Sequence, residues 1–136
     1  MLSDKTYYAT YKKRSEWATV YALQQMKKHQ LKDWAFHIAS FYEEERRAEY
    51  LGHSETERSL GVCAQKDGEK VIVLFPVALR FTKYQIRQTV LHEIAHALAP
   101  EEENPHGLLW LETCERIMSG AMALSEYMVY YDRAEA

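Results

Sequence analysis

Hydrophobic and polar positions change their period twice along the 136 residues of this chain. Up to about Leu31 the large apolar residues recur at helical spacing, with Trp17 and Tyr21 on one side. Ser15 is a candidate N-cap for this segment, and the basic run 27–29 suits the negative end of a helix dipole. The pattern predicts an N-terminal helix. The tyrosine-rich residues before Ser15 form either an earlier turn of that helix or an arm on the core.

The middle of the chain alternates between apolar and polar residues, which is the period of a half-buried strand. This alternation predicts a first strand within residues 34–41. Residues 58–64 and 70–75 are two further strand candidates, and the turn between them, 66–69, has Asp-Gly at its centre, as hairpins favour. The charged run 43–47 is expected to be an exposed connector, with a short helix or a lid as the alternatives.

Helical spacing returns in the last third of the chain. Thr82 and Gln85 have the spacing of a capping box, and the apolar positions after them recur every three to four residues up to Ala99. The proline that follows disfavours helical backbone at the residue before it, so this helix is predicted to end at Ala99. A further helix is expected over 108–119, with Gly120 as its C-terminal stop.

These elements predict one α+β domain over residues 1–136, with an N-terminal helix, a short mixed or antiparallel sheet and two later helices. Hydrophobic residues at 47% and charged residues at 27% are typical of a soluble globular protein. No apolar run approaches the roughly 18 residues of a membrane span, so no membrane partner is expected. Cys63 and Cys114 lie far apart without a CxxC pair, and we expect both to be buried and reduced, as in the cytoplasm.

The residues that carry chemistry begin with His92, Glu93 and His96 on the predicted helix. Two imidazoles four residues apart lie on one helix face and can reach the same metal ion. Glu93 is rotated about a quarter turn away, where it can act as a base on a water molecule instead of binding the metal. This spacing suits zinc-assisted hydrolysis. The alternative is an amphipathic helix with two histidines that bind no metal.

A catalytic zinc site usually takes three protein ligands and leaves one position open. His106 is the favoured third ligand, because the helix has stopped and the intervening acidic stretch 101–104 gives the chain room to turn back. Glu112 or Glu115, from the following helix, would give the alternative set of two histidines and one glutamate. The alternative for these two glutamates is that they are exposed to solvent and bind no metal.

The run 92–98 and the later His-Gly-Leu-Leu-Trp at 106–110 together resemble the SprT-like zinc metallopeptidases, the group that includes Spartan. The resemblance covers about residues 34–120. It implies that His92, His96 and His106 bind one zinc ion and that Glu93 is the general base. It also implies a small zincin-like fold, with a short sheet packed against the metal-binding helix.

The leading hypothesis is therefore a cytoplasmic zinc endopeptidase that cleaves protein or peptide substrates, with Glu93 activating the attacking water. Such sites usually hold a second oxyanion donor, for which Tyr127, Tyr130 and Tyr131 are candidates, although packing is the commoner role of such residues. Their segment is compatible with either a strand or a short helix.

Two alternatives come from other classes. The first is a protease that acts on DNA-bound or DNA-crosslinked proteins. Its motivation is a set of basic residues that could cluster near the sheet edge and the start of the predicted metal-binding helix: Arg46, Arg47, Arg58, Lys66, Lys70, Arg80, Lys83 and Arg87. The net charge of -3 weighs against it. The second alternative is a metal-binding regulatory protein without proteolysis, for which Glu93 would have no use.

Overall fold

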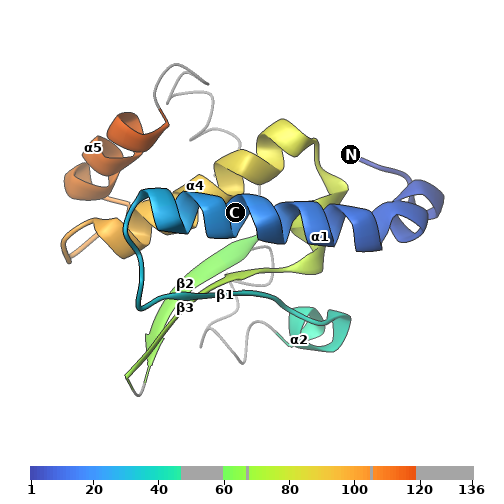
Figure 1. Cartoon of the computed structure of the whole chain (residues 1–136), viewed down its shortest axis with the longest axis horizontal. Coiled ribbons are helices and arrows are strands. Elements are labelled where there is room, and N and C mark those ends of the chain that lie inside the picture. Colours follow the sequence, from blue (N-terminus) through green and yellow to red (C-terminus); the bar gives the residue numbers. More distant parts are fainter. Residues whose placement is uncertain (47–59, 67, 105, 119–136) are drawn as a thin grey trace.

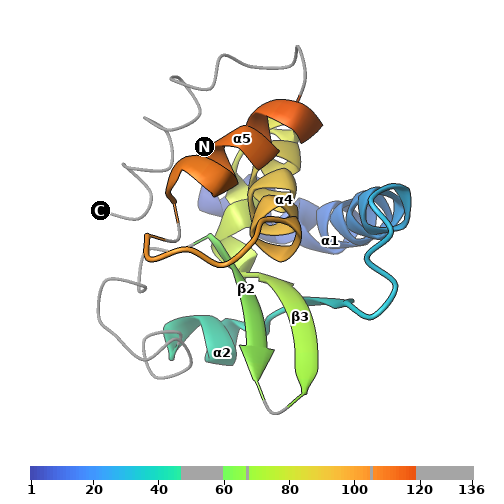
Figure 2. The same cartoon turned by 90° about the vertical axis from the view of Figure 1, so that its left-hand side faces the viewer.

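The computed structural model describes residues 1–46, 60–66, 68–104 and 106–118, which form an α+β fold as predicted (Figure 1). Helices α1, α4 and α5 lie on one side of a small sheet, as Figures 1 and 2 show. In chain order the described elements are α1 (Asp4–Lys28), β1 (Ala35–Ile38), α2 (Phe41–Glu45), β2 (Gly61–Lys66), β3 (Glu69–Leu74), the 3-10 helix η2 (Pro76–Arg80), α4 (Lys83–Leu98) and α5 (Leu108–Ile117).

The sheet has the strand order β1-β3-β2 and is mixed. Strand β3 lies in the centre, parallel to β1 and antiparallel to β2. The β2–β3 pair is the predicted hairpin, and Gly68 in its turn has a φ of 81°, which glycine adopts without steric cost. Ile72 and Leu74 of β3 belong to the core cluster that the helices share, whereas Val73 and Phe75 belong to a second buried cluster. The central strand is thus covered on both faces.

Helix α1 starts earlier than the sequence predicted. Its N-cap is Ser3, whose hydroxyl accepts from the amide of Thr6, and Ser15 lies inside the helix. The assignment of Ser15 as the cap was therefore wrong. Contacts distant in sequence hold the first half of the helix: the Arg14 Nε–H donates to the carbonyl of Leu79 at 2.6 Å, and its guanidinium also donates to the carbonyl of Phe81.

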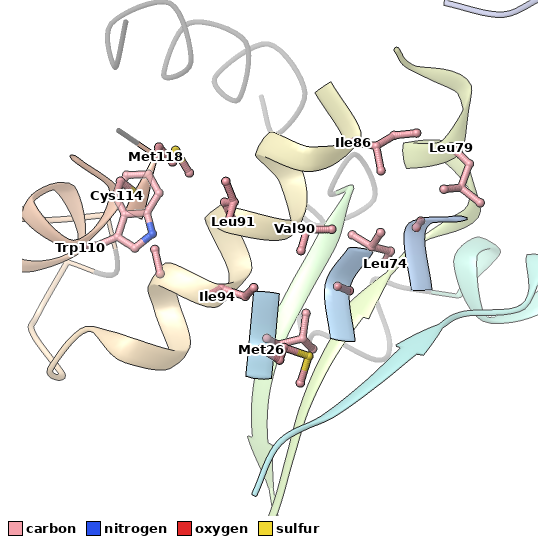
Figure 3. Close-up of a cluster of buried hydrophobic side chains, with 14 of the residues drawn as sticks. Met26, Leu74, Leu79, Ile86, Val90, Leu91, Ile94, Trp110, Cys114 and Met118 are labelled. Atoms are coloured by element: carbon pink, nitrogen blue, oxygen red, sulfur yellow. The ribbon is translucent and has the colours of Figure 1, made fainter. Parts of the chain in front are cut away.

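Helix α4 begins and ends where the sequence predicted. The Thr82 hydroxyl accepts from the amide of Gln85, and the Gln85 side chain accepts in return from the amide of Thr82, which completes the capping box. Ala99 is the C-cap. Figure 3 shows the apolar side chains of α4 packed between α5 on one side and the sheet with α1 on the other.

The charged run after β1 is not merely an exposed connector. Residues Phe41–Glu45 form α2, which opens with a capping box between Ser40 and Glu43, and the Glu44 carboxylate accepts from the amide of Val77. Helix α5 ends at Ile117, before the predicted stop at Gly120, which lies outside the described residues together with the tyrosine-rich tail. Within the described part of the chain, no helix has the length and apolar character required to cross a membrane.

Candidate metal centre

Three imidazoles meet at one point in the structure. The Nε2 atom of His92 lies 3.2 Å from Nε2 of His96 and 3.2 Å from Nε2 of His106. One ring nitrogen carries either one hydrogen or one lone pair, so it cannot make two good hydrogen bonds at once. A shared cation accounts for both contacts, because nitrogens bound tetrahedrally at about 2.0–2.1 Å lie about 3.4 Å apart. The three side chains therefore form a group that could hold a metal ion.

Burial keeps the imidazoles of His92 and His96 neutral at pH 7. His92 is only 1% exposed, and burial, followed by the neighbouring imidazoles, holds its pKa well below the usual range. Burial and the charge of His106 likewise lower the pKa of His96 to about 3. A neutral imidazole has a free ring lone pair, which is the form that binds metals. At pH 7, then, no proton has to leave His92 or His96 before an ion binds.

Trp110 of α5 forms the packing surface behind the imidazoles. The centroid of its ring lies 4.8 Å from that of His92, 5.4 Å from that of His96 and 4.7 Å from that of His106. Its indole N–H points to the carbonyl of His92 at 3.4 Å. Trp110 is 1% exposed, so this surface excludes water from one side of the group. In the sequence, Trp110 was identified only as part of the family pattern, and its packing behind all three histidines was not predicted.

His106 reaches the site from the loop between α4 and α5. Its amide donates to the side-chain oxygen of Asn104 at 3.0 Å, and the amide of Gly107 donates to the carbonyl of Asn104 at 2.9 Å. Glu112 and Glu115, the alternative third ligands, are both exposed on α5. Neither belongs to the group of converging ligand atoms in the described residues.

Glu93 of α4 is buried, with 3% of its surface exposed. A Cβ placed on Gly61 of β2 would lie 3.4 Å from Cγ of Glu93, so the glycine lets the strand approach this side chain closely. The charge of Glu93 also adds to the effect of burial on two thiols: the pKa of Cys63 is raised, and that of Cys114 is raised to about 12. Both cysteines are free, Cys114 is buried as expected, and Cys63 is only half-buried.

The basic residues predicted from the sequence lie at different places in the structure. Arg80 pairs with Asp4 and lies over the ring of Tyr7, so it serves the contact between η2 and α1. Lys83 and Arg87 instead gather over the ring of Trp17, at the start of α4. Arg46 lies over the ring of Tyr42, and Lys70 is exposed on β3. Lys66 is the last residue of β2. The remaining predicted positions, Arg47, Arg58, Tyr127, Tyr130 and Tyr131, lie outside the described residues.

Comparison with known proteins gives one match. The model of the SprT-like family matches residues 23–128, which is more than half of the chain and includes all three histidines and Glu93. No curated protein and no solved structure matches the chain.

Proposed function

This chain belongs to the SprT-like family, and we propose that it is a zinc-dependent endopeptidase with a small zincin-like fold. The SprT-like family is associated with zinc metallopeptidase-like domains. The observation that carries the proposal is the meeting of three imidazole nitrogens, one from the loop after α4 and two from α4 itself, which also presents a buried glutamate one residue after the first histidine. Free cysteines in the described residues agree with a reducing compartment such as the cytoplasm.

His92, His96 and His106 would hold the ion through Nε2. Three neutral nitrogen donors leave a fourth position open in a tetrahedral site, which is the arrangement of catalytic zinc. When bound, zinc supplies a Lewis acid that polarises a carbonyl and lowers the pKa of water. Zinc is favoured over magnesium or calcium because imidazole suits zinc, whereas the two harder ions prefer oxygen ligands.

Glu93 acts as the general base. Its carboxylate takes a proton from the attacking water as the new carbon–oxygen bond forms at the peptide carbonyl. The same carboxyl group then gives that proton to the amide nitrogen as the carbon–nitrogen bond breaks, so the group ends the cycle ionised. Burial between α4 and β2 restricts the rotamers of Glu93 and so limits the entropy lost in the reaction.

The test is Glu93→Gln, which keeps the size of the side chain and removes its basicity. We expect the variant to keep one zinc per chain, by elemental analysis, and to lose cleavage of an unfolded protein substrate. Glu101→Gln is the matched control, because Glu101 is exposed near the site and should be dispensable. Full activity in Glu93→Gln would refute the general-base role. Stoichiometric metal without cleavage of any substrate by the unmodified protein would favour a metal-binding regulatory protein.

A DNA-associated protease is the second candidate. The observation in its favour is the gathering of Lys83 and Arg87 over Trp17, where Lys13, one helical turn before Trp17 on α1, is also exposed. Cations beside aromatic rings suit nucleic-acid backbones and bases. Cleavage should then rise on addition of DNA and the effect should fall with salt. Equal activity with and without DNA would dismiss this candidate.

A further inference from the structure

Three consecutive glutamates precede His106, and the structure treats them differently. Glu101 and Glu103 are exposed, whereas Glu102 is half-buried. The Glu102 Oε1 atom accepts a hydrogen bond from the backbone amide of Trp110 at 3.1 Å. The middle residue of the acidic run therefore links the loop after α4 to the start of α5.

Helix α5 lacks a cap of its own. Its N-cap is Gly107, which has no side chain to accept a hydrogen bond, and Trp110 is the third residue of the helix. The amides of the first turn have no partner within a helix, and an N-cap side chain normally accepts from one of them. Glu102 makes this bond from outside the helix, and its negative charge is favourable at the positive end of the helix dipole.

Gly107 makes room for this carboxylate. A Cβ placed on Gly107 would lie 2.6 Å from Oε2 of Glu102 and 2.9 Å from the carbonyl oxygen of Asn104. Carbon and oxygen atoms that are not bonded do not approach so closely, so the carboxylate could not stay where it is beside a larger residue. Gly107 directly follows His106, so the carboxylate lies beside the residue next to the third metal-ligand candidate.

We propose that Glu102 is a positioning residue for the metal centre. Its carboxylate closes the loop between α4 and α5, and this loop carries His106 and leads into Trp110. One bond therefore fixes both the third imidazole and the ring that packs behind all three. Asn104 orders the same loop from within, through His106 and Gly107. The inference rests on the proposed function only in that these imidazoles bind a metal.

The test compares Glu102→Ala and Glu102→Gln with Glu101→Ala and Glu103→Ala in the full chain. Zinc affinity is measured by competition with a chelator, and exchange of the Trp110 amide hydrogen is followed by NMR in the metal-free protein. We expect Glu102→Ala to weaken zinc binding about 10- to 100-fold, as loss of outer-shell partners does, and to speed the exchange. Glu102→Gln retains an oxygen acceptor and should recover most of both. The two control variants remove the same charge and should match the unmodified protein.

A merely structural role would lower stability and leave zinc affinity unchanged. The positioning role is overturned if Glu102→Ala binds zinc as tightly as the unmodified protein. It is also overturned if all three alanine variants lose the same affinity, since that indicates charge attraction alone. Should Glu102→Ala fail to fold, Gly107→Ala tests the same contact, and unchanged affinity there would overturn the role. An unmodified protein that binds no zinc would refute the proposed function itself, whereas slow exchange of the Trp110 amide would still confirm the cap.

Discussion

Replacing Gly61 by alanine should separate the stability of the sheet from the reactivity of the site. A Cβ at Gly61 would lie 2.8 Å from the carbonyl oxygen of Val73, 3.2 Å from Cδ2 of Leu74 and 3.4 Å from Cγ of Glu93. Val73 is in the central strand, which is held on both sides, so its carbonyl cannot retreat cheaply. The strand β2 must shift instead, and Glu93 lies directly against it.

Gly68→Ala is the matched control in the same hairpin. No heavy atom lies within 4 Å of a Cβ there, but the φ of 81° strains any residue with a side chain. Overpacking at Gly61 should lower the free energy of unfolding by about 1–3 kcal/mol. Left-handed backbone at Gly68 should cost about 1–2 kcal/mol. The two variants should therefore be similarly destabilised, for unrelated reasons, and only the first disturbs Glu93.

Urea unfolding of the metal-free variants measures the free energy of unfolding, and kcat/KM for peptide cleavage measures the reactivity of the site. We expect Gly61→Ala to lose roughly tenfold or more in kcat/KM, because small misplacements of catalytic groups are costly. Gly68→Ala should keep the activity of the unmodified protein once both are fully folded. Equal activities in the two variants would refute the argument that the approach of β2 positions Glu93. A Gly61→Ala variant as stable as the unmodified protein would refute the close approach itself.

Three further predictions concern the capping box, the tryptophan and the thiols. Thr82→Ala should lower the free energy of unfolding by about 1 kcal/mol in urea titrations, while Thr82→Ser should not; equal stabilities would contradict the cap. Trp110→Ala should cost about 3–5 kcal/mol in the same assay and Trp110→Phe less, and a loss below about 1 kcal/mol for the alanine variant would count against the packing behind the imidazoles. The third prediction uses a Cys63→Ser background, in which Cys114 is the remaining thiol. Because its pKa is raised to about 12, little Cys114 thiolate is present at pH 8, and an aromatic disulfide reagent should react slowly, faster as the pH rises, and fully after unfolding. Rapid reaction of the native protein would contradict the burial of Cys114.

Elements with local signals were predictable from the sequence. The capping box of Thr82 and Gln85 needs only residues three apart, and the hairpin at Gly68 needs only a turn that tolerates positive φ. The start of α1 was not predictable in this way. Ser15 has the right chemistry for a cap, but Arg14 is held by carbonyl oxygens 65 and 67 residues away, and these contacts favour a helix that continues past it.

The sheet illustrates the same limit. The sequence indicated three strands without their order, and mixed and antiparallel arrangements remained equally open. The parallel pairing of β1 with β3 depends on the connection between them, which includes α2 and β2, and not on the residues of β1 alone. The alternation in β1 did predict its buried face, since Phe36 and Ile38 are half-buried while Ala35 and His37 are exposed.

In the metal centre, two ligand candidates depend on a local signal and the third depends on contacts beyond its own segment. His92 and His96 lie one helical turn apart, so their convergence depends only on α4 forming. The convergence of His106 depends on closure of a loop, and the bond that closes it comes from the middle one of three chemically identical glutamates. The chain does hold one local sign of that bond. A glycine at the start of a helix offers no side-chain acceptor, so water or another side chain accepts from the first turn, and an acidic run a few residues upstream can supply that acceptor. Which glutamate does so depends on the direction in which the loop leaves α4, and three identical neighbours in the sequence do not specify that direction.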